Sequence, residues 1–169
     1  SEITLDSRQI TYIIETMNIF ILDSDPKLSA QYHSDKHCVK MVLETAQILC
    51  SAFPKGEAPY KQTHVNHPSC VWARQSQDNY LWLISLGKEL GKEYTYRYGK
   101  THKSVAVISW CEQNINKIAF PQGEMTSFAQ AMPDDYVDMD AVKAYRNYYR
   151  YEKHNINKWE KSRTRPNWL

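Results

Sequence analysis

Glycine is scarce in this sequence, with 5 residues among 169. Turn-rich β-sandwiches and barrels rely on glycine where the backbone needs a positive φ, so the composition argues against both architectures. The two glycine patterns that let a backbone wrap a phosphate, Gly-x-Gly-x-x-Gly and Gly-x4-Gly-Lys-Ser/Thr, are also missing. We therefore do not predict a glycine-rich phosphate-binding loop.

The sequence also has no apolar run close to the ~20 residues that cross a bilayer, so we expect a soluble protein with no membrane partner. No signal peptide is visible, and the four cysteines form no Cys-x-x-Cys pair. We therefore expect buried free thiols in a reducing cytoplasm, at Cys38, Cys50, Cys70 and Cys111.

The net charge of +2 is small, but the charges are unevenly distributed along the chain. Residues 120–140 contain five acidic residues and no basic ones, whereas residues 141–169 contain eight basic residues and two acidic ones. A basic tail after an acidic loop indicates either a partner with negative charge or a match between the two segments. Both interpretations stay open at this point.

Aromatic residues are abundant, with 12 tyrosines and 5 tryptophans, and most of the chain after Asp25 has helical spacing. We predict helices near residues 25–53, 68–98, 104–118 and 139–153, separated by loops at 54–67 and 120–137. β-branched and aromatic runs at 3–5, 10–14 and 18–22 predict short strands. The expected fold is mainly α, with four to five helices packed in one domain and a small N-terminal β element.

Met17 and the residues after it resemble the natural start of a protein. We therefore interpret residues 1–16 as an N-terminal extension or an extra strand. Residues 17–169 are predicted to form a single, mainly helical domain.

The most informative stretch is residues 32–44, where four chemically active side chains share one line of a predicted helix. At ~100° per residue, positions 33, 37, 40 and 44 follow one another along the helix. That line carries two imidazoles, an amine and a carboxylate, from His33, His37, Lys40 and Glu44. In a metal-free catalytic site, Glu44 acts as general acid or base and Lys40 as an amine nucleophile. The structural alternative is a set of i, i+4 surface pairs.

Two histidines four residues apart on a helix also form half of a common zinc site. In that alternative, His33 and His37 hold zinc or another divalent metal together with His64, His67 or Glu44. The zincin pattern His-Glu-x-x-His is absent, and the Lys40 ammonium group would repel a neighbouring cation. We therefore predict a site without a cofactor and keep the metal site as the alternative.

Two stretches mix tyrosines with basic residues, at 93–104 and 144–153. Basic side chains hold phosphates and aromatic rings stack on unpaired bases, so the two stretches predict a nucleic-acid or nucleotide partner. Imidazoles at a helix start near residues 64–69 form a further candidate anion site. Each pattern also has a structural alternative. The residues at 64–69 can cap a helix, the cations at 93–104 can complement the dipole at a helix end, and Arg74 can pair with Asp78. The predicted phosphate-binding residues are His67, Arg74, Arg97, Lys100, His102, Lys103, Arg146 and Arg150.

Several longer motifs resemble a family of small proteins encoded in tailed-phage genomes. They read MNIFILDSDP at 17–26, AQYHSDKHCVKMVLETAQ at 30–47, NHP at 66–68, EYTYRYGKTHKS at 93–104, QAMP at 130–133 and YRNYY at 145–149. The resemblance covers most of the chain from residue 17 onward. It implies a phage origin and a location in the host cytoplasm, and it leaves the reaction open.

The composition and the run Arg-Pro-Asn-Trp at 165–168 are also similar to the small all-α phage pyrimidine-dimer DNA glycosylases. Those enzymes excise bases with an amine and a glutamate, and their amine belongs to the mature N-terminal residue. Because Ser1 stands on an extension here, the likeness implies that Lys40 replaces that amine.

Together these features predict a phage enzyme that acts on nucleic acid or a nucleotide through the Lys/Glu/His helix face. Base excision of the glycosylase/lyase type is its most concrete version. One alternative is a metal-dependent hydrolase with a His-x3-His helix site. The other is a non-catalytic phage protein that binds a host protein or sequesters a nucleotide.

Overall fold

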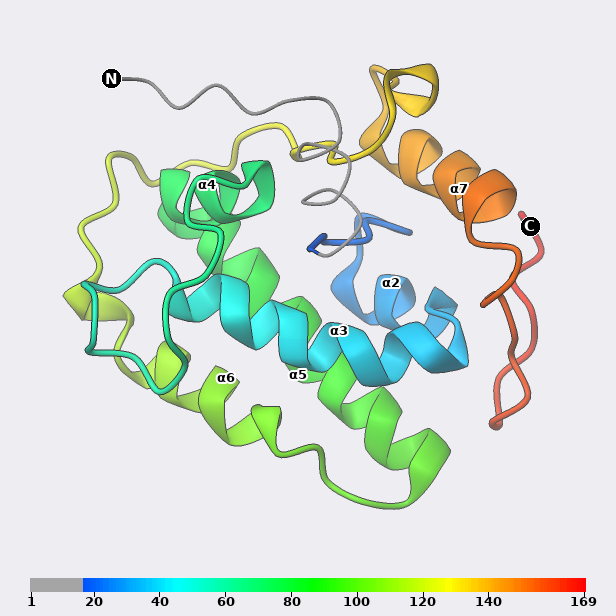
Figure 1. Ribbon diagram of the computed structural model, residues 1–169, viewed down its shortest axis with the longest axis horizontal. Helices are drawn as coiled ribbons and strands as arrows, with labels where there is room; N and C mark the ends of the chain where they lie inside the picture. The colour runs from blue at the N-terminus through cyan, green and yellow to red at the C-terminus, as the bar shows by residue number, and fades with distance from the viewer. Residues whose placement is uncertain (1–16) are drawn as a thin grey trace.

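The computed structural model describes residues 17–169, which form six α-helices and two short 3-10 turns (Figure 1). The mainly α prediction is confirmed, although the helices outnumber the four to five expected. The four cysteines are buried free thiols, as predicted. No helix within these residues is long and apolar enough to cross a membrane. The elements are α2 Pro26–Tyr32, α3 Asp35–Cys50, α4 Pro68–Gln75, α5 Gln77–Tyr98, α6 Ser104–Gln113, η1 Ile115–Lys117, η2 Asp134–Tyr136 and α7 Ala141–Glu152.

Two serines account for the additional helices, because each divides a predicted helix in two. The Ser34 hydroxyl accepts a hydrogen bond from the His37 N–H, so α3 begins afresh at residue 35. The Ser76 hydroxyl accepts from the Asn79 N–H at 3.0 Å and starts α5 in the same way. Each hydroxyl satisfies an amide that the first turn of a helix leaves unpaired.

The predicted β element is not supported where the structure describes it. Residues 18–22 form no strand and instead make a buried irregular segment. The Ser29 hydroxyl holds this segment, since it donates to the Phe20 carbonyl and accepts from the Leu22 N–H. Side-chain hydrogen bonds thus replace the strand ladder that β-propensity predicts. The runs at 3–5 and 10–14, and the predicted extension 1–16, lie outside the described residues.

α5 is the central helix and contacts α2, α3, α4 and α6 (Figure 1). Two glycines allow its neighbours to approach closely. A Cβ at Gly87 would lie 2.9 Å from Thr45 Cγ2 of α3 and 3.0 Å from Ile108 Cδ1 of α6. A Cβ at Gly91 would lie 2.7 Å from Val105 Cγ2. The missing side chains therefore fix the distance between α5 and the two helices beside it.

α7 packs on the irregular segment at 18–22 through buried tyrosines. The Phe20 ring contacts the rings of Tyr145, Tyr148 and Tyr149, with centroids 5.9, 6.2 and 5.5 Å away. Residues 120–137 are irregular apart from η2, as predicted. Residues 153–169, which we call the C-terminal tail, leave α7 and run along one side of the molecule (Figure 1).

Candidate acid–base site

The four residues predicted to share a helix line do not all lie on one helix. α2 ends at Tyr32, and His33 follows it with an extended backbone, at φ −61° and ψ 136°. α3 begins only after the Ser34 cap. His37, Lys40 and Glu44 therefore remain on one face of α3, and the predicted placement of His33 is wrong. The cap interrupts the helical spacing on which that prediction depended.

His33 is instead buried in the core beside α2. Its Nδ1 lies 2.6 Å from the Ser29 carbonyl oxygen, which can only accept, so Nδ1 carries the proton. Burial lowers the pKa of His33 from 6.5 to about 4, so the ring is neutral near pH 7. Its buried Nε2 has no hydrogen-bond partner among residues 17–169. His33 thus secures the end of α2 through its hydrogen bond to Ser29.

A tyrosine from α7 holds the second histidine. The Tyr149 hydroxyl lies 2.8 Å from His37 Nδ1 and accepts from the Ser34 N–H at 2.9 Å. The Phe20 ring packs on the His37 ring at 4.5 Å between centroids. Burial lowers the pKa of His37, and nearby basic groups lower it further, so this imidazole is also neutral.

A neutral buried histidine makes stability depend on pH. Below pH 6.5 the unfolded chain binds a proton at His33, whereas the folded protein binds it only near pH 4. Stability is therefore lost as the pH falls between these values, by up to about 3 kcal/mol for this residue. We expect His33→Asn, whose amide can keep the bond to Ser29, to remove that loss. Urea unfolding at about pH 7.5 and about pH 4.5 measures it.

His154→Asn is the matched control for this prediction. His154 is exposed, and its Nδ1 also lies near a main-chain carbonyl, that of Tyr151 at 3.2 Å. Its variant should show the pH dependence of the wild type. A His33→Asn variant with the same pH dependence as the wild type would show that His33 is not the group that resists protonation.

Glu44 is the buried carboxyl group of the α3 face. The residue is 5% exposed, and its Oε1 lies 3.9 Å from the Lys40 Nζ one turn earlier. Burial raises the pKa of Glu44 from 4.5 to about 7, against the opposing charges of Lys40 and Lys153. A carboxyl group with this pKa can both give and take a proton near neutral pH, as general acid–base catalysis requires.

Lys40 lies on the solvent side of Glu44. Its side chain is 52% exposed, so the amine is not enclosed in a dry pocket. The i, i+4 pair that the sequence offered as a structural alternative is present. However, an ordinary surface pair exposes both partners, whereas here the carboxyl partner is buried. The pair therefore consists of a solvent-exposed ammonium group and a buried carboxyl group.

Lys153, which the sequence analysis did not single out, faces the same site from the end of α7. Its Nζ lies 5.0 Å from the Tyr148 ring centroid, and its charge acts on both Glu44 and His37. No local pattern indicates this role, because α7 is far from α3 in sequence. With Lys40 and Lys153 around one carboxyl group, the site favours a ligand with negative charge.

No family model, curated protein or solved structure matches this chain. The resemblance to phage proteins therefore stays a prediction. For the predicted phosphate-binding residues, burial and existing contacts decide which side chains are free to meet a ligand.

Arg97 is not free to meet a ligand, contrary to the prediction. Its side chain is fully buried and pairs with Asp35 at 3.2 Å and with Glu93 at 3.0 Å. It also donates to the His33 carbonyl at 2.7 Å. Arg163 adds a second guanidinium to Glu93 at 2.6 Å. The network joins α5 to the start of α3 and to the C-terminal tail, so Arg97 has a structural role.

Arg146 and Arg150 are also engaged within the fold. Arg146 pairs with Asp23 at 3.1 Å, and its guanidinium lies 5.0 Å from the Trp168 ring centroid. Arg150 donates to the Trp168 carbonyl. Both arginines therefore hold the end of the C-terminal tail against α7, and contrary to the prediction their guanidinium groups are engaged within the fold.

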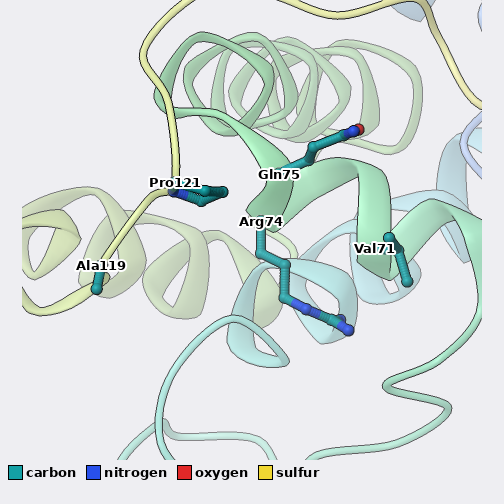
Figure 2. Close-up of a pocket in the computed structure, with 5 residues that line it drawn as sticks. All are labelled: Val71, Arg74, Gln75, Ala119 and Pro121. Carbon is teal, nitrogen blue, oxygen red and sulfur yellow. The ribbon is translucent and has the colours of Figure 1, made fainter.

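Two predicted phosphate-binding residues near α4 make contacts within the fold: His67 caps the helix, and Arg74 contacts the loop before it. His67 caps the helix, with its Nδ1 accepting from the Ser69 N–H at 3.0 Å. Arg74 donates to the Val65 carbonyl instead of pairing with Asp78. It also lines a hollow of about 360 Å³, which includes no residue of the α3 face (Figure 2). The hollow is lined by Val71, Arg74, Gln75, Ala119 and Pro121.

Lys100 and Lys103 are the exposed members of the predicted set. His102 between them is half-buried, with its Nδ1 accepting from the Ser104 N–H at 3.1 Å. Its ring meets the Tyr94 ring edge-on at 4.9 Å, and burial lowers its pKa. The cations available for phosphate in the predicted 93–104 stretch therefore lie beyond the end of α5.

The alternative metal site of His33, His37 and His64 is not assembled. The His33 and His37 rings lie 6.4 Å apart between centroids, and Nδ1 of His33 contacts the Ser29 carbonyl. His64 lies exposed in the loop at 54–67. In the described part of the chain, no three His, Cys, Asp or Glu side chains are grouped to hold a metal ion.

Proposed function

We propose that this protein is an enzyme acting on a nucleotide or nucleic acid, with Glu44 as its proton-transfer group. The observation that supports it is an almost fully buried carboxyl group one turn from a half-exposed lysine, Lys40. His37 precedes both on the same face of α3. Burying an ionisable group lowers stability, and such strongly perturbed groups cluster at catalytic sites.

Positive charge around Glu44 favours an anionic substrate. Lys36 and Lys40 are exposed and stand two turns and one turn before Glu44 on α3. Lys153 brings a third ammonium group from α7. Lysine clusters of this kind hold phosphate groups as point charges. A phosphate held by Lys36 and Lys153 places the sugar and base of a nucleotide within reach of Lys40 and Glu44.

Base excision is the most concrete form of the reaction. After the Lys40 ammonium group releases a proton to solvent, its amine attacks C1′ of the sugar and the bond to the base breaks. Glu44 gives a proton to the departing base. The Glu44 carboxylate then takes one proton from the Lys40 nitrogen and passes it to O4′ as the C1′–O4′ bond breaks, so the ring opens and a protonated imine joins C1′ to the Lys40 nitrogen. Borohydride reduces this imine to a stable secondary amine.

A panel of nucleotides, single-stranded DNA and duplex DNA tests the proposal, first by thermal shift and then by product analysis. We expect a ligand of this panel to stabilise the protein and to be turned over. Glu44→Gln should still bind it but react about 10²–10⁴-fold more slowly. Glu112→Gln is the matched control, because Glu112 is an exposed glutamate that also pairs with a lysine, Lys88 at 3.1 Å.

The outcomes separate the alternatives. Turnover that a chelator abolishes would favour the metal-dependent hydrolase. Tight binding without product, unchanged in Glu44→Gln, would favour a binding protein. A borohydride-trapped DNA adduct that is lost in Lys40→Ala supports base excision. If no member of the panel shifts the melting temperature, a nucleotide or nucleic-acid substrate is excluded by this test.

A further inference from the structure

We propose that the end of α5 and the C-terminal tail form a binding surface for single-stranded nucleic acid. The proposal rests on the proposed function above, for which it names the form of the substrate. In Figure 1 the tail descends along the side of the molecule on which α5 ends. We call this surface the tail patch, and it consists of Tyr96, Tyr98, Lys100, Lys161, Arg163 and Arg165.

An exposed aromatic ring is the first observation. Tyr96 is 56% exposed although its side chain is large and aromatic. The Arg163 guanidinium lies 4.5 Å from its ring centroid, and its hydroxyl donates to the Ser162 carbonyl at 3.4 Å. The ring is therefore held in place while much of it faces solvent. Unpaired bases stack on rings of this kind, whereas a duplex keeps its bases stacked on one another.

Tyr98 is the second aromatic ring of the tail patch, and Lys161 provides a cation beside it. The Tyr98 ring stacks on the Tyr94 ring, with 5.2 Å between the centroids. The Lys161 Nζ lies 5.9 Å from the centroid of the Tyr98 ring. The Tyr98 hydroxyl donates to the Asp35 carbonyl at 3.1 Å, which fixes the ring. The tail thus places a cation beside each of the two rings, Lys161 at Tyr98 and Arg163 at Tyr96, and a single strand offers both bases and phosphates to such pairs.

Two buried carboxylates beside the tail patch, those of Glu93 and Asp35, are already paired with arginines. Glu93 accepts from Arg97 and Arg163, and Asp35 pairs with Arg97. Burial opposes the ionisation of Glu93, but the hydrogen bonds and charges of these arginines outweigh it and lower the pKa of Glu93. The paired carboxylates therefore repel a polyanion little.

The solvent-facing charge of the tail patch is mainly positive as a result. Lys100, Lys161 and Arg165 are exposed, and Glu160 is the exposed carboxylate of the adjoining tail. A strand that neutralises its phosphates on these cations releases counterions, so binding should weaken as salt is added. Charge thus supplies affinity, and the tyrosines supply the preference for unpaired bases.

The tail is fixed by the protein itself. The Asp35 N–H donates to the Lys158 carbonyl at 2.9 Å, and the Asp35 carboxylate accepts from the Glu160 N–H at 2.7 Å. The Trp159 indole donates to the Tyr32 carbonyl at 3.2 Å. These bonds directly precede Lys161, Arg163 and Arg165, the tail cations that belong to the tail patch. Because the backbone is already ordered, a strand can bind without a large ordering cost.

Fluorescence anisotropy with a labelled oligothymidylate and the full chain tests this proposal over a range of salt concentrations. We expect Tyr96→Ala to weaken binding about 10-fold, because one stacked base is lost. We expect Lys161→Ala to reduce the slope of log Kd against log salt by about 0.7, because one phosphate contact is lost. Both side chains are exposed at the surface, so both variants should fold like the wild type.

Two controls match these variants in exposure and in local contacts. Tyr151 is 59% exposed at the end of α7, with the Arg150 guanidinium 5.7 Å from its ring centroid. Lys117 lies 6.0 Å from the Trp110 ring centroid, in η1 at the opposite side of Figure 1 from the tail. Tyr151→Ala and Lys117→Ala should therefore bind the oligonucleotide as the wild type does.

Three results would overturn the tail patch: no binding by the wild type, equal binding by Tyr96→Ala and Tyr151→Ala, or equal affinity for a duplex of the same length. The last would mean that charge alone drives binding. Failure of this proposal is separable from failure of the proposed function. Turnover of a nucleotide or duplex substrate without binding of the oligonucleotide would overturn the tail patch alone. Binding that Tyr96→Ala weakens, with no turnover by the wild type, would overturn the proposed function alone.

Discussion

Replacing Arg97 with alanine is expected to lower the free energy of unfolding by about 3–5 kcal/mol. The guanidinium is fully buried between Asp35 and Glu93, so its removal leaves two buried carboxylates short of their cation. Arg163 still pairs with Glu93, but Asp35 loses its arginine. The His33 carbonyl also loses a donor at 2.7 Å. Urea unfolding of both proteins at neutral pH measures the difference.

Lys88→Ala is the control for the Arg97 prediction. Lys88 pairs with Glu112 at 3.1 Å, but the two side chains are 47% and 43% exposed. An exposed pair of this kind contributes less than about 1 kcal/mol, so its loss should change the unfolding midpoint little. An Arg97→Ala variant as stable as Lys88→Ala would contradict the structural role of Arg97 and would restore it as a candidate ligand of phosphate.

Glu44→Gln is expected to stabilise the protein at about pH 8, by up to about 3 kcal/mol. The pKa of Glu44 is about 7 in the fold and 4.5 in the unfolded chain. Between these values the unfolded chain releases a proton that the folded protein keeps, so wild-type stability falls as the pH rises. Above pH 7 the folded protein carries the full cost of a buried carboxylate. Glutamine resembles the protonated form and avoids that cost.

The measurement is urea unfolding of wild type and variant at about pH 4 and about pH 8. The two proteins should have similar stability at the acidic pH, where Glu44 is protonated in both states. Glu112→Gln, which alters an exposed pair, should follow the wild type at both values. A Glu44→Gln variant that is less stable than the wild type at about pH 8 would mean that Glu44 is held as a carboxylate and is not poised for proton transfer.

Taken together, the two variants distinguish a buried charge that stabilises the fold, that of Arg97, from one that destabilises it, that of Glu44. Both Arg97 and Glu44 are buried. The Arg97 charge is paired on two sides, whereas Glu44 has one ammonium group at 3.9 Å. Removing the first therefore destabilises the protein, and removing the second stabilises it above neutral pH. Destabilising groups of this kind are retained where function needs them.

Local sequence was sufficient to predict most of the helices. The α7 helix begins at Ala141, close to the predicted start at residue 139, and its cap Asp140 accepts from the Val142 N–H. α5 ends at Tyr98 and is followed by Gly99, whose φ of +72° agrees with the prediction of a glycine after the last helical residue. The breaks at Ser34 and Ser76 were also present in the sequence as capping residues, but uninterrupted helical spacing concealed them.

Other features depended on contacts between segments far apart in the chain. Residues 18–22 have strong β-propensity, yet Ser29 satisfies their backbone groups and no strand forms in this segment. Arg97 lies in a Tyr/Arg/Lys stretch that is typical of phosphate binding, yet Asp35 and Glu93 enclose it. Burial and pairing, which decide whether a charge is free, are properties of the packed molecule and leave no local pattern.

The sequence by itself determined that this protein is mainly helical and that His37, Lys40 and Glu44 lie on one helix face, because helix propensity and the 3.6-residue period are local. Only the tertiary structure decided what that face can do. Packing buried Glu44 and moved its pKa to about 7, and it brought Lys153 from α7 to the same site. Desolvation and charge proximity act through space, so they became visible only when the chain was folded.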